Sequence, residues 1–81
     1  MAKHDVKIYT TPTCVYCRMT KEFFKQNGVA YKEVDVAADE KAAMQMIEKS
    51  GQMGVPVIEI DDKTIIVGYD KEALRKALEL S

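Results

Sequence analysis

Residues 8–17 read IYTTPTCVYC, so that a short apolar segment, a turn with a proline and a pair of cysteines follow one another directly. The alternation of side chains before the turn predicts a strand, because successive residues of a strand point to opposite faces of a sheet. The residues that alternate with Lys7 and Tyr9 in this strand are Val6, Ile8 and Thr10. Residues 11–13 end the strand, and a helix is predicted to begin at about Cys14.

Strand and helix periods continue to alternate along the rest of the chain. The first helix is predicted to run from Cys14 to Asn27, because Gly28 readily takes the left-handed conformation that ends helices. The other predicted elements are a strand over residues 31–36, a helix from a cap at Asp39 to Lys49, strands over residues 57–60 and 64–67, and a last helix capped by Asp70. The order β-α-β-α-β-β-α predicts an α/β fold with a mixed four-stranded sheet and three helices.

The connections between these elements predict part of the sheet topology. A helix separates the first two strands, so we expect them to be parallel with a right-handed crossover. The turn over residues 61–63 predicts that the last two strands form an antiparallel hairpin.

Apolar stripes at helical spacing mark the helix faces that are expected to be buried. They comprise Ala42, Ala43, Met46 and Ile47 in the second helix and Ala73, Leu74, Ala77 and Leu78 in the last. Flexible side chains that fill gaps in the core are expected at Met19, Met44 and Met46. We expect Phe23 in the core, Phe24 on the surface of its helix and His4 in solvent.

The chain has 81 residues, of which 47% are hydrophobic and 31% charged, with a formal net charge of −1. This balance is typical of one globular domain, here spanning residues 1–81, that is too small to enclose a large cofactor. Charges of both signs are interspersed, which argues against nucleic-acid binding. No apolar run predicts a signal peptide or a membrane span, so we expect a cytoplasmic protein, and we expect it to be a monomer.

The cysteine pair carries the chemical prediction. Two cysteines are too few to staple a secreted mini-protein, and a close pair in the cytoplasm is more often catalytic or metal-binding than structural. At a helix N-terminus, free backbone N–H groups and the helix dipole favour the thiolate of Cys14. Cys17 follows one turn later, close enough to form a disulfide with it. We therefore predict thiol–disulfide exchange, with Cys14 as nucleophile and Cys17 as resolving thiol.

Three other interpretations of the cysteine pair are possible. A zinc site would need more ligands than Cys14, Cys17 and His4 offer, so no bound metal is expected. A structural disulfide would close a very small loop and would be reduced in the cytoplasm. Two ordinary core cysteines are the third interpretation.

The whole chain resembles the glutaredoxin family, which has the thioredoxin fold. The segments that carry the resemblance are residues 8–10, the CVYC motif at residues 14–17, residues 52–56 and Gly68-Tyr69-Asp70. The resemblance implies a cis peptide bond between Val55 and Pro56 beside the active site, with the preceding backbone free to pair with a bound thiol peptide. It also implies that Tyr16 lines the groove for that peptide.

The resemblance further implies that glutathione is the co-substrate that re-reduces the protein and that no other cofactor is bound. The segment Gly68-Tyr69-Asp70 stands where the family binds a carboxylate of glutathione, and the first turn of a helix offers N–H groups to such an anion. The chain departs from the glutathione users at Thr11, where many of them have lysine, at Met53 and Gly54, where a basic residue and threonine are common, and at Val67-Gly68, where they have a glycine pair.

These departures lead to alternative functions. Val15 between the two cysteines is similar to the residue found there in the NrdH-type redoxins. These proteins resemble glutaredoxins but take electrons from thioredoxin reductase and donate them to ribonucleotide reductase. An iron–sulfur or metal carrier would use Cys14 from two chains, as some glutaredoxins do. A non-enzymatic adaptor would bind a partner through Tyr16, Val55 and Tyr69. For the oxidoreductase, the expected substrates are protein or small-molecule disulfides.

Overall fold

The computed structural model describes residues 4–79. Its elements are β1 (Val6–Thr10), α1 (Val15–Gln26), β2 (Lys32–Asp35), α2 (Glu40–Ser50), β3 (Val57–Ile60), β4 (Thr64–Val67) and α3 (Lys71–Ala77). The predicted order of strands and helices is confirmed. Cys14, Asp39 and Asp70 cap the three helices, and the side chain of each accepts a hydrogen bond from a backbone N–H group of the first turn.

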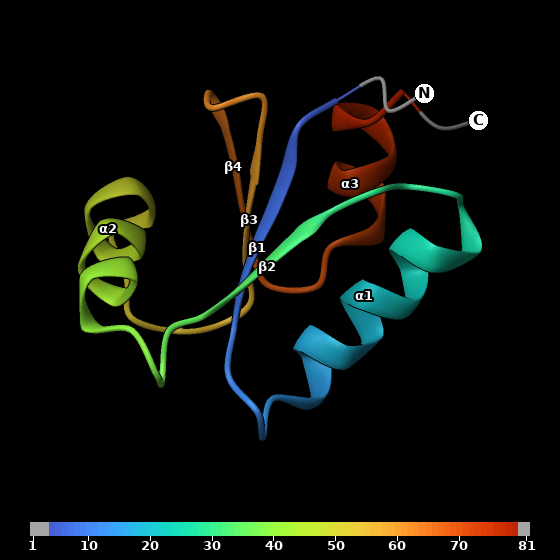
Figure 1. Cartoon of the computed structure of the whole chain (residues 1–81). Helices are drawn as coiled ribbons and strands as arrows, with labels where there is room; N and C mark the ends of the chain where they lie inside the picture. The colour runs from blue at the N-terminus through green and yellow to red at the C-terminus, as the bar shows by residue number, and fades with distance from the viewer. Residues whose placement is uncertain (1–3, 80–81) are drawn as a thin grey trace.

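The sheet has the strand order β2-β1-β3-β4, with α2 on one face and α1 and α3 on the other (Figure 1). β1 and β2 are parallel and β3 and β4 are antiparallel, as predicted. β1 also pairs antiparallel with β3, an arrangement that no local pattern predicted. The loop that follows β1 and the loop that precedes β3 lie at the same end of the sheet (Figure 1), which brings the cysteine pair close to residues 52–56.

The face covered by α1 and α3 holds the larger apolar core. Its buried residues are Val6, Ile8, Phe23, Phe24, Ile58, Ile60, Ile66, Leu74 and Leu78. Phe24 is 0% exposed, so its predicted place on the helix surface is wrong. The segment returning from α1 to β2 covers this side of the helix, and the Tyr31 ring lies 5.3 Å from the Phe24 ring between centroids.

The face covered by α2 holds a smaller cluster, formed by Tyr9, Ala42, Met46 and Val57. Tyr9 is buried although the alternation predicted a polar position, because β1 is central and is covered on both faces. Met46 fills the core as predicted. The same prediction is wrong for Met19 and Met44, which are exposed because they lie on the outer sides of their helices.

Polar groups accompany the α2 cluster. Glu59 is only 4% exposed, and its two carboxylate oxygens accept hydrogen bonds from Lys49 Nζ at 2.9 and 3.0 Å. Lys7 Nζ lies 4.0 Å from the same carboxylate. The hydroxyl of Tyr9 is buried and has no hydrogen-bond partner within residues 4–79. This side of the sheet is therefore held by mixed apolar and ionic contacts.

The prediction that His4 lies in solvent is wrong. The turn between β3 and β4 folds back onto the start of β1 and partly covers this side chain. Its Nδ1 lies 2.6 Å from Asp61 Oδ2, and its Nε2 lies 3.1 Å from Glu79 Oε2. The hydrogen bond with Asp61 raises the pKa of His4 above its usual value and lowers the pKa of Asp61. We call these three residues the His4 clasp.

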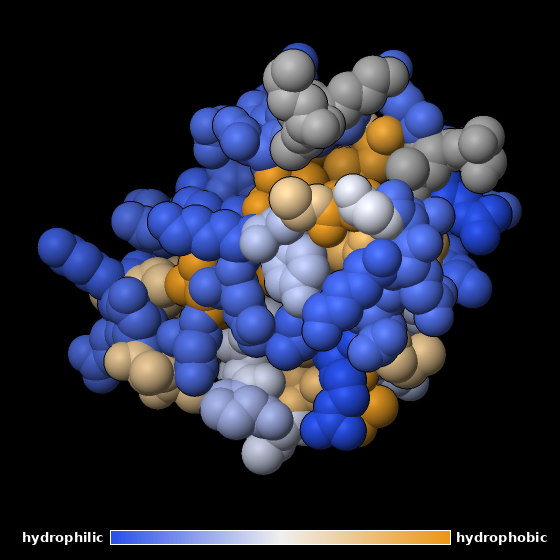
Figure 2. Space-filling model, turned by 45° about the vertical axis from the view of Figure 1, so that its right-hand side comes forward, coloured by the Kyte–Doolittle hydropathy of each residue, from blue (hydrophilic) through white to orange (hydrophobic). Residues whose placement is uncertain are grey.

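On the face shown in Figure 2, hydrophilic side chains predominate and patches of hydrophobic residues are visible between them. Among residues 4–79, no helix combines the length and the apolar character that crossing a membrane requires.

Candidate active site

The cysteine pair lies where the chain leaves β1 and enters α1. Cys14 is the N-cap of α1 with an extended backbone (φ −85°, ψ 112°), and its N–H donates to Thr11 O at 3.3 Å. The backbone N–H of Cys17 donates to Cys14 Sγ at 3.0 Å. The two cysteines are joined by a disulfide, and their Cα atoms are 5.2 Å apart. No acidic residue lies in the first turn of α1, so the N–H groups and helix dipole that favour a sulfur anion are unopposed within that turn.

The two sulfurs differ in access to solvent. Cys14 is partly exposed, whereas Cys17 is 1% exposed and packs beneath the first turn of α1. This difference follows from helix geometry, since Cys14 precedes the helix and Cys17 lies one turn later on the side that faces the sheet. Cys14 is therefore the more accessible of the two sulfurs.

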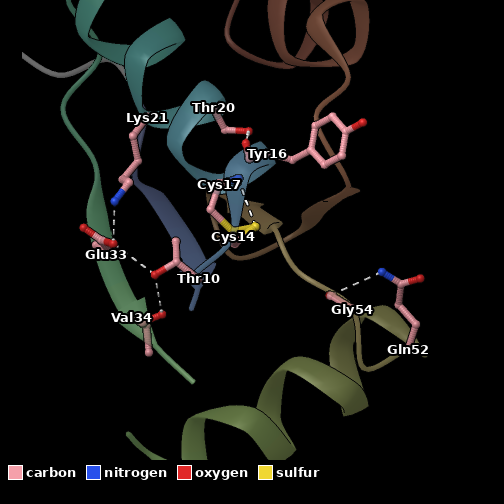
Figure 3. The surroundings of a disulfide bond; sticks show 10 residues. All are labelled: Thr10, Cys14, Tyr16, Cys17, Thr20, Lys21, Glu33, Val34, Gln52 and Gly54. Atoms are coloured by element: carbon pink, nitrogen blue, oxygen red, sulfur yellow. Dashed lines mark hydrogen bonds and ion pairs between the residues drawn. A yellow bond between two sulfur atoms is a disulfide. The ribbon is translucent and has the colours of Figure 1, made fainter. Parts of the chain in front are cut away.

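Apolar side chains project around the accessible cysteine. Tyr16 is 61% exposed, and Figure 3 shows its ring directed away from β1 and β2. Val15 on the same turn is also exposed. Large apolar groups that remain in solvent beside a reactive atom are suited to contact a partner molecule.

The Val55–Pro56 peptide bond is cis, as the resemblance implied. Pro56 is buried, and Val55 packs against the apolar cluster beneath α2. The backbone N–H of Gly68 donates to Pro56 O at 2.8 Å, so the chain segment before α3 is fastened to the loop before β3. Val55, Pro56 and Gly68 are therefore brought together at one place.

Tyr69 and Asp70 have local partners of their own. Tyr69 is half-buried and packs against the core beneath α1 and α3. Asp70 is exposed, and its Oδ1 accepts a hydrogen bond from Ala73 N–H at 3.1 Å. The side chain of Asp70 thus occupies one of the free N–H groups at the start of α3.

A polar network near the cysteine pair was missed by the sequence analysis. Thr10 is buried, and its hydroxyl donates to Glu33 Oε2 at 3.0 Å. Lys21 Nζ donates to the same oxygen at 2.9 Å, and this hydrogen bond is the main cause that lowers the pKa of Glu33. The three residues come from β1, α1 and β2. Only the parallel register of β1 and β2 could have indicated this contact.

The residues that could hold a metal ion are few. Within residues 4–79, no three or more side chains of histidine, cysteine, aspartate or glutamate are grouped in a way that could bind one. The cysteine pair itself presents one partly exposed and one buried sulfur.

Comparisons with known proteins agree with this geometry. The glutaredoxin family model matches residues 6–65. The chain is 46% identical over 74 residues to a glutaredoxin-like 8.6 kDa protein in the rubredoxin operon of Clostridium pasteurianum, covering 91% of this chain and 97% of that protein. It is 36% identical over 61 residues to glutaredoxin 3 of Escherichia coli, covering 75% and 74% of the two chains.

A solved structure of a thioredoxin-like protein variant superposes on the chain with a TM-score of 0.87 and 31% identity, covering 95% of this chain and 97% of the other. The fold is therefore thioredoxin-like, as the resemblance implied. With the family match over most of the chain and the Cys14–Cys17 pair in place, the protein belongs to the glutaredoxin family and is a thiol–disulfide oxidoreductase.

Proposed function

We propose that the protein reduces protein or small-molecule disulfides by a dithiol mechanism in which Cys14 attacks and Cys17 resolves. The observation that carries the proposal is the hydrogen bond from Cys17 N–H to Cys14 Sγ at the start of α1. The Cys14 thiolate attacks one substrate sulfur and forms a mixed disulfide, while the other substrate sulfur leaves as a thiolate. Cys17 then attacks Cys14 Sγ, which releases the second substrate thiolate and leaves the protein oxidised.

Glutathione is the proposed reductant and co-substrate, with no other cofactor bound. The names of both relatives described above include glutaredoxin, which supports this choice. We propose that glutathione, or another peptide that carries a thiol, binds between Tyr16 and the Val55–Pro56 bond. A carboxylate of this ligand would lie near Gly68, Tyr69 and Asp70. The hydrogen bond between Gly68 N–H and Pro56 O keeps these two parts of the groove together.

Thioredoxin reductase is the second candidate reductant, as in the NrdH-type redoxins. The Asp70 carboxylate favours it, because this side chain already accepts from Ala73 N–H and brings a negative charge to the place proposed for the glutathione carboxylate. Thioredoxin reductase would need no such carboxylate site.

We propose that the protein works as a cytoplasmic monomer and that its substrates are proteins with disulfides. Size-exclusion chromatography would test the oligomeric state, and cell fractionation would test the location.

A coupled assay separates the two reductants. Oxidised protein is offered to glutathione with glutathione reductase and, separately, to thioredoxin reductase, and NADPH consumption is followed in both. Turnover with glutathione alone supports the first proposal, and turnover with thioredoxin reductase alone replaces it by the second. Two results would contradict the assigned roles of the cysteines. One is a Cys14→Ser variant that keeps its activity. The other is a mixed disulfide with substrate that accumulates in Cys14→Ser and not in Cys17→Ser.

A further inference from the structure

The α2 helix covers only part of its face of the sheet. Its buried residues Ala42 and Met46 pack with Tyr9 and Val57, which lie side by side on β1 and β3. Side chains two positions apart on a strand point to the same face, so Lys7 belongs to the next row toward the start of β1. This row lies at the end of the sheet away from the cysteine pair, because the cysteines follow the other end of β1 (Figure 1).

The row that contains Lys7 is charged and borders a hollow. The strand register pairs Lys7 with Lys32 on β2 and with Glu59 on β3. The hollow has a volume of about 220 Å³ and is lined by Asp5, Val6, Lys7, Lys32, Glu59 and Asp62. Pockets for drug-sized ligands usually measure about 300–1,000 Å³. The hollow therefore suits a smaller ligand.

Positive and negative groups line different sides of the hollow. The two lysines come from β2 and β1, whereas Asp62 comes from the turn after β3. Asp5 precedes β1 and is tied to the same turn, because its backbone N–H donates to Asp61 Oδ1 at 2.9 Å. We call the position of Lys7 and Lys32 the lysine side and that of Asp5 and Asp62 the aspartate side.

The contacts within the protein leave part of this charge without a partner. Glu59 is neutralised by Lys49 of α2, whose Nζ lies 2.9 and 3.0 Å from its two oxygens. Lys7 Nζ is more distant, at 4.0 Å from the same carboxylate. Within residues 4–79, no ion pair is formed by the other charged groups of the hollow, which are Lys32, Asp5 and Asp62. Like charges directly opposite on paired strands repel, so a carboxylate between Lys7 and Lys32 would relieve this repulsion.

The charges select the class of ligand. The lysines Lys7, Lys32 and Lys49 balance the carboxylates Asp5, Glu59 and Asp62, so these groups together have no net charge. An anion would be repelled by the aspartate side and a cation by the lysine side, whereas a zwitterion complements both. The two sides lie up to two strand spacings apart, about 10 Å between backbones. A zwitterion whose charges are separated by a short chain therefore fits better than one with both charges on a single carbon.

We propose that this hollow binds a small zwitterion of the ω-amino acid type. Its carboxylate lies between Lys7 and Lys32, and its ammonium group lies at Asp5 and Asp62. Because ion pairs with partly exposed partners are weak, we expect a Kd of about 1–10 mM. The inference goes beyond the proposed dithiol mechanism and uses neither cysteine, so either can fail without the other.

Nuclear magnetic resonance titration of the labelled protein tests the site with three probes of matched size. At low salt, 4-aminobutyrate should shift the amide signals of residues 5–7, 32, 59 and 62 in a saturable way and leave those of residues 14–17 unchanged. Butyrate has only the carboxylate and butylammonium only the ammonium group. Each should bind about fivefold more weakly, because it loses the attraction of one side and keeps the repulsion of the other.

Variants of the two sides assign the orientation of the ligand. Lys32→Gln should weaken 4-aminobutyrate about two- to fivefold and leave butylammonium no weaker, whereas Asp62→Asn should weaken 4-aminobutyrate equally and leave butyrate no weaker. Asparagine tolerates the φ of 58° at Asp62, so the turn is preserved. The control is Lys63→Gln, an exposed residue of the same turn that does not line the hollow.

Three results would overturn the inference. One is the absence of a saturable shift at about ten times the expected Kd. Another is equal binding of the three probes. The third is 4-aminobutyrate binding that Lys32→Gln and Asp62→Asn leave unchanged, or that Lys63→Gln weakens as much. Reduction of a small disulfide, measured in parallel, should be the same in wild type and Lys32→Gln. Its absence in the wild type would contradict the dithiol mechanism alone.

Discussion

The two faces of the sheet are stabilised in different ways. Beneath α1 and α3 lies the larger apolar core, which includes Phe23, Phe24 and Leu74. Beneath α2 a smaller cluster shares the space with the buried carboxylate of Glu59, its partner Lys49 and the unpaired hydroxyl of Tyr9. The cysteine pair belongs to the apolar face, because α1 carries Cys17 inward.

This contrast indicates how stability and chemistry are divided in a small domain. The helix that presents the reactive sulfur rests mainly on apolar packing, with the Lys21–Glu33 ion pair at its edge. Close-packed side chains hold a helix more rigidly than charged pairs with one partly exposed member. The α2 face tolerates polar groups because it positions only the loop that leads to Pro56.

The largest predicted effect is on the apolar face. Phe24→Ala should lower the free energy of unfolding by about 4 kcal/mol, because it removes a fully buried ring and leaves a cavity. Met46→Ala in the smaller cluster should cost about 2–3 kcal/mol. Urea denaturation measures both, with the exposed Met44→Ala as control. A larger loss for Met46→Ala would remove the distinction between the faces.

The second predicted effect concerns the ion pair beneath α2. Lys49→Met should destabilise the protein by about 1–2 kcal/mol, because Glu59 stays buried with only Lys7, at 4.0 Å, near its charge. The exposed Lys41→Met on the same helix is the matched control. The hydrogen bond with Glu59 raises the pKa of Lys49, so the contribution of the lysine charge to stability is present at neutral pH and is lost as the pH rises through that pKa. Equal stability of the two variants would contradict an ionic role for Lys49.

A smaller effect of opposite sign is expected at Tyr9. Its buried hydroxyl has no hydrogen-bond partner within residues 4–79, so Tyr9→Phe should leave the free energy of unfolding unchanged or raise it by up to about 1 kcal/mol. Chemical denaturation of the variant beside the wild type checks this. A clear loss of stability would show that the hydroxyl is satisfied in solution.

The smallest effect is expected from the His4 clasp, in which His4 joins the start of β1 to Asp61 and Glu79 by polar contacts. Because Asp61 raises the pKa of His4, the proton-dependent stabilisation is complete below the unfolded pKa of histidine and is lost as pH rises through the raised value. The lowered pKa of Asp61 gives a second limit, with its contribution lost as pH falls through that value. His4→Asn should therefore melt at a lower temperature than the wild type at mildly acidic pH and at nearly the same temperature at alkaline pH. A difference independent of pH would assign His4 a packing role.

Local sequence signals were sufficient for the elements and for the two cysteines. Gly28 and Gly51 take positive φ at helix ends, and Cys14, Asp39 and Asp70 cap helices, because capping depends on a few neighbouring residues. Helix periodicity, which is also a local rule, predicted that Cys14 faces outward and Cys17 inward. The alternation rule failed at Tyr9, since a strand covered on both faces buries every side chain whatever its period.

Local sequence patterns predicted the order of strands and helices, the orientation of the strand pairs that are consecutive in the chain, and the position of a cysteine pair at a helix start. Each of these depends on interactions between residues close in the chain. Only the tertiary structure decided that β1 lies beside β3, that His4 meets Asp61, and that Thr10 meets Glu33 beside the cysteines. These contacts join residues separated by 23 to 57 positions, and their partners follow from how the sheet closes and not from any pattern within one segment.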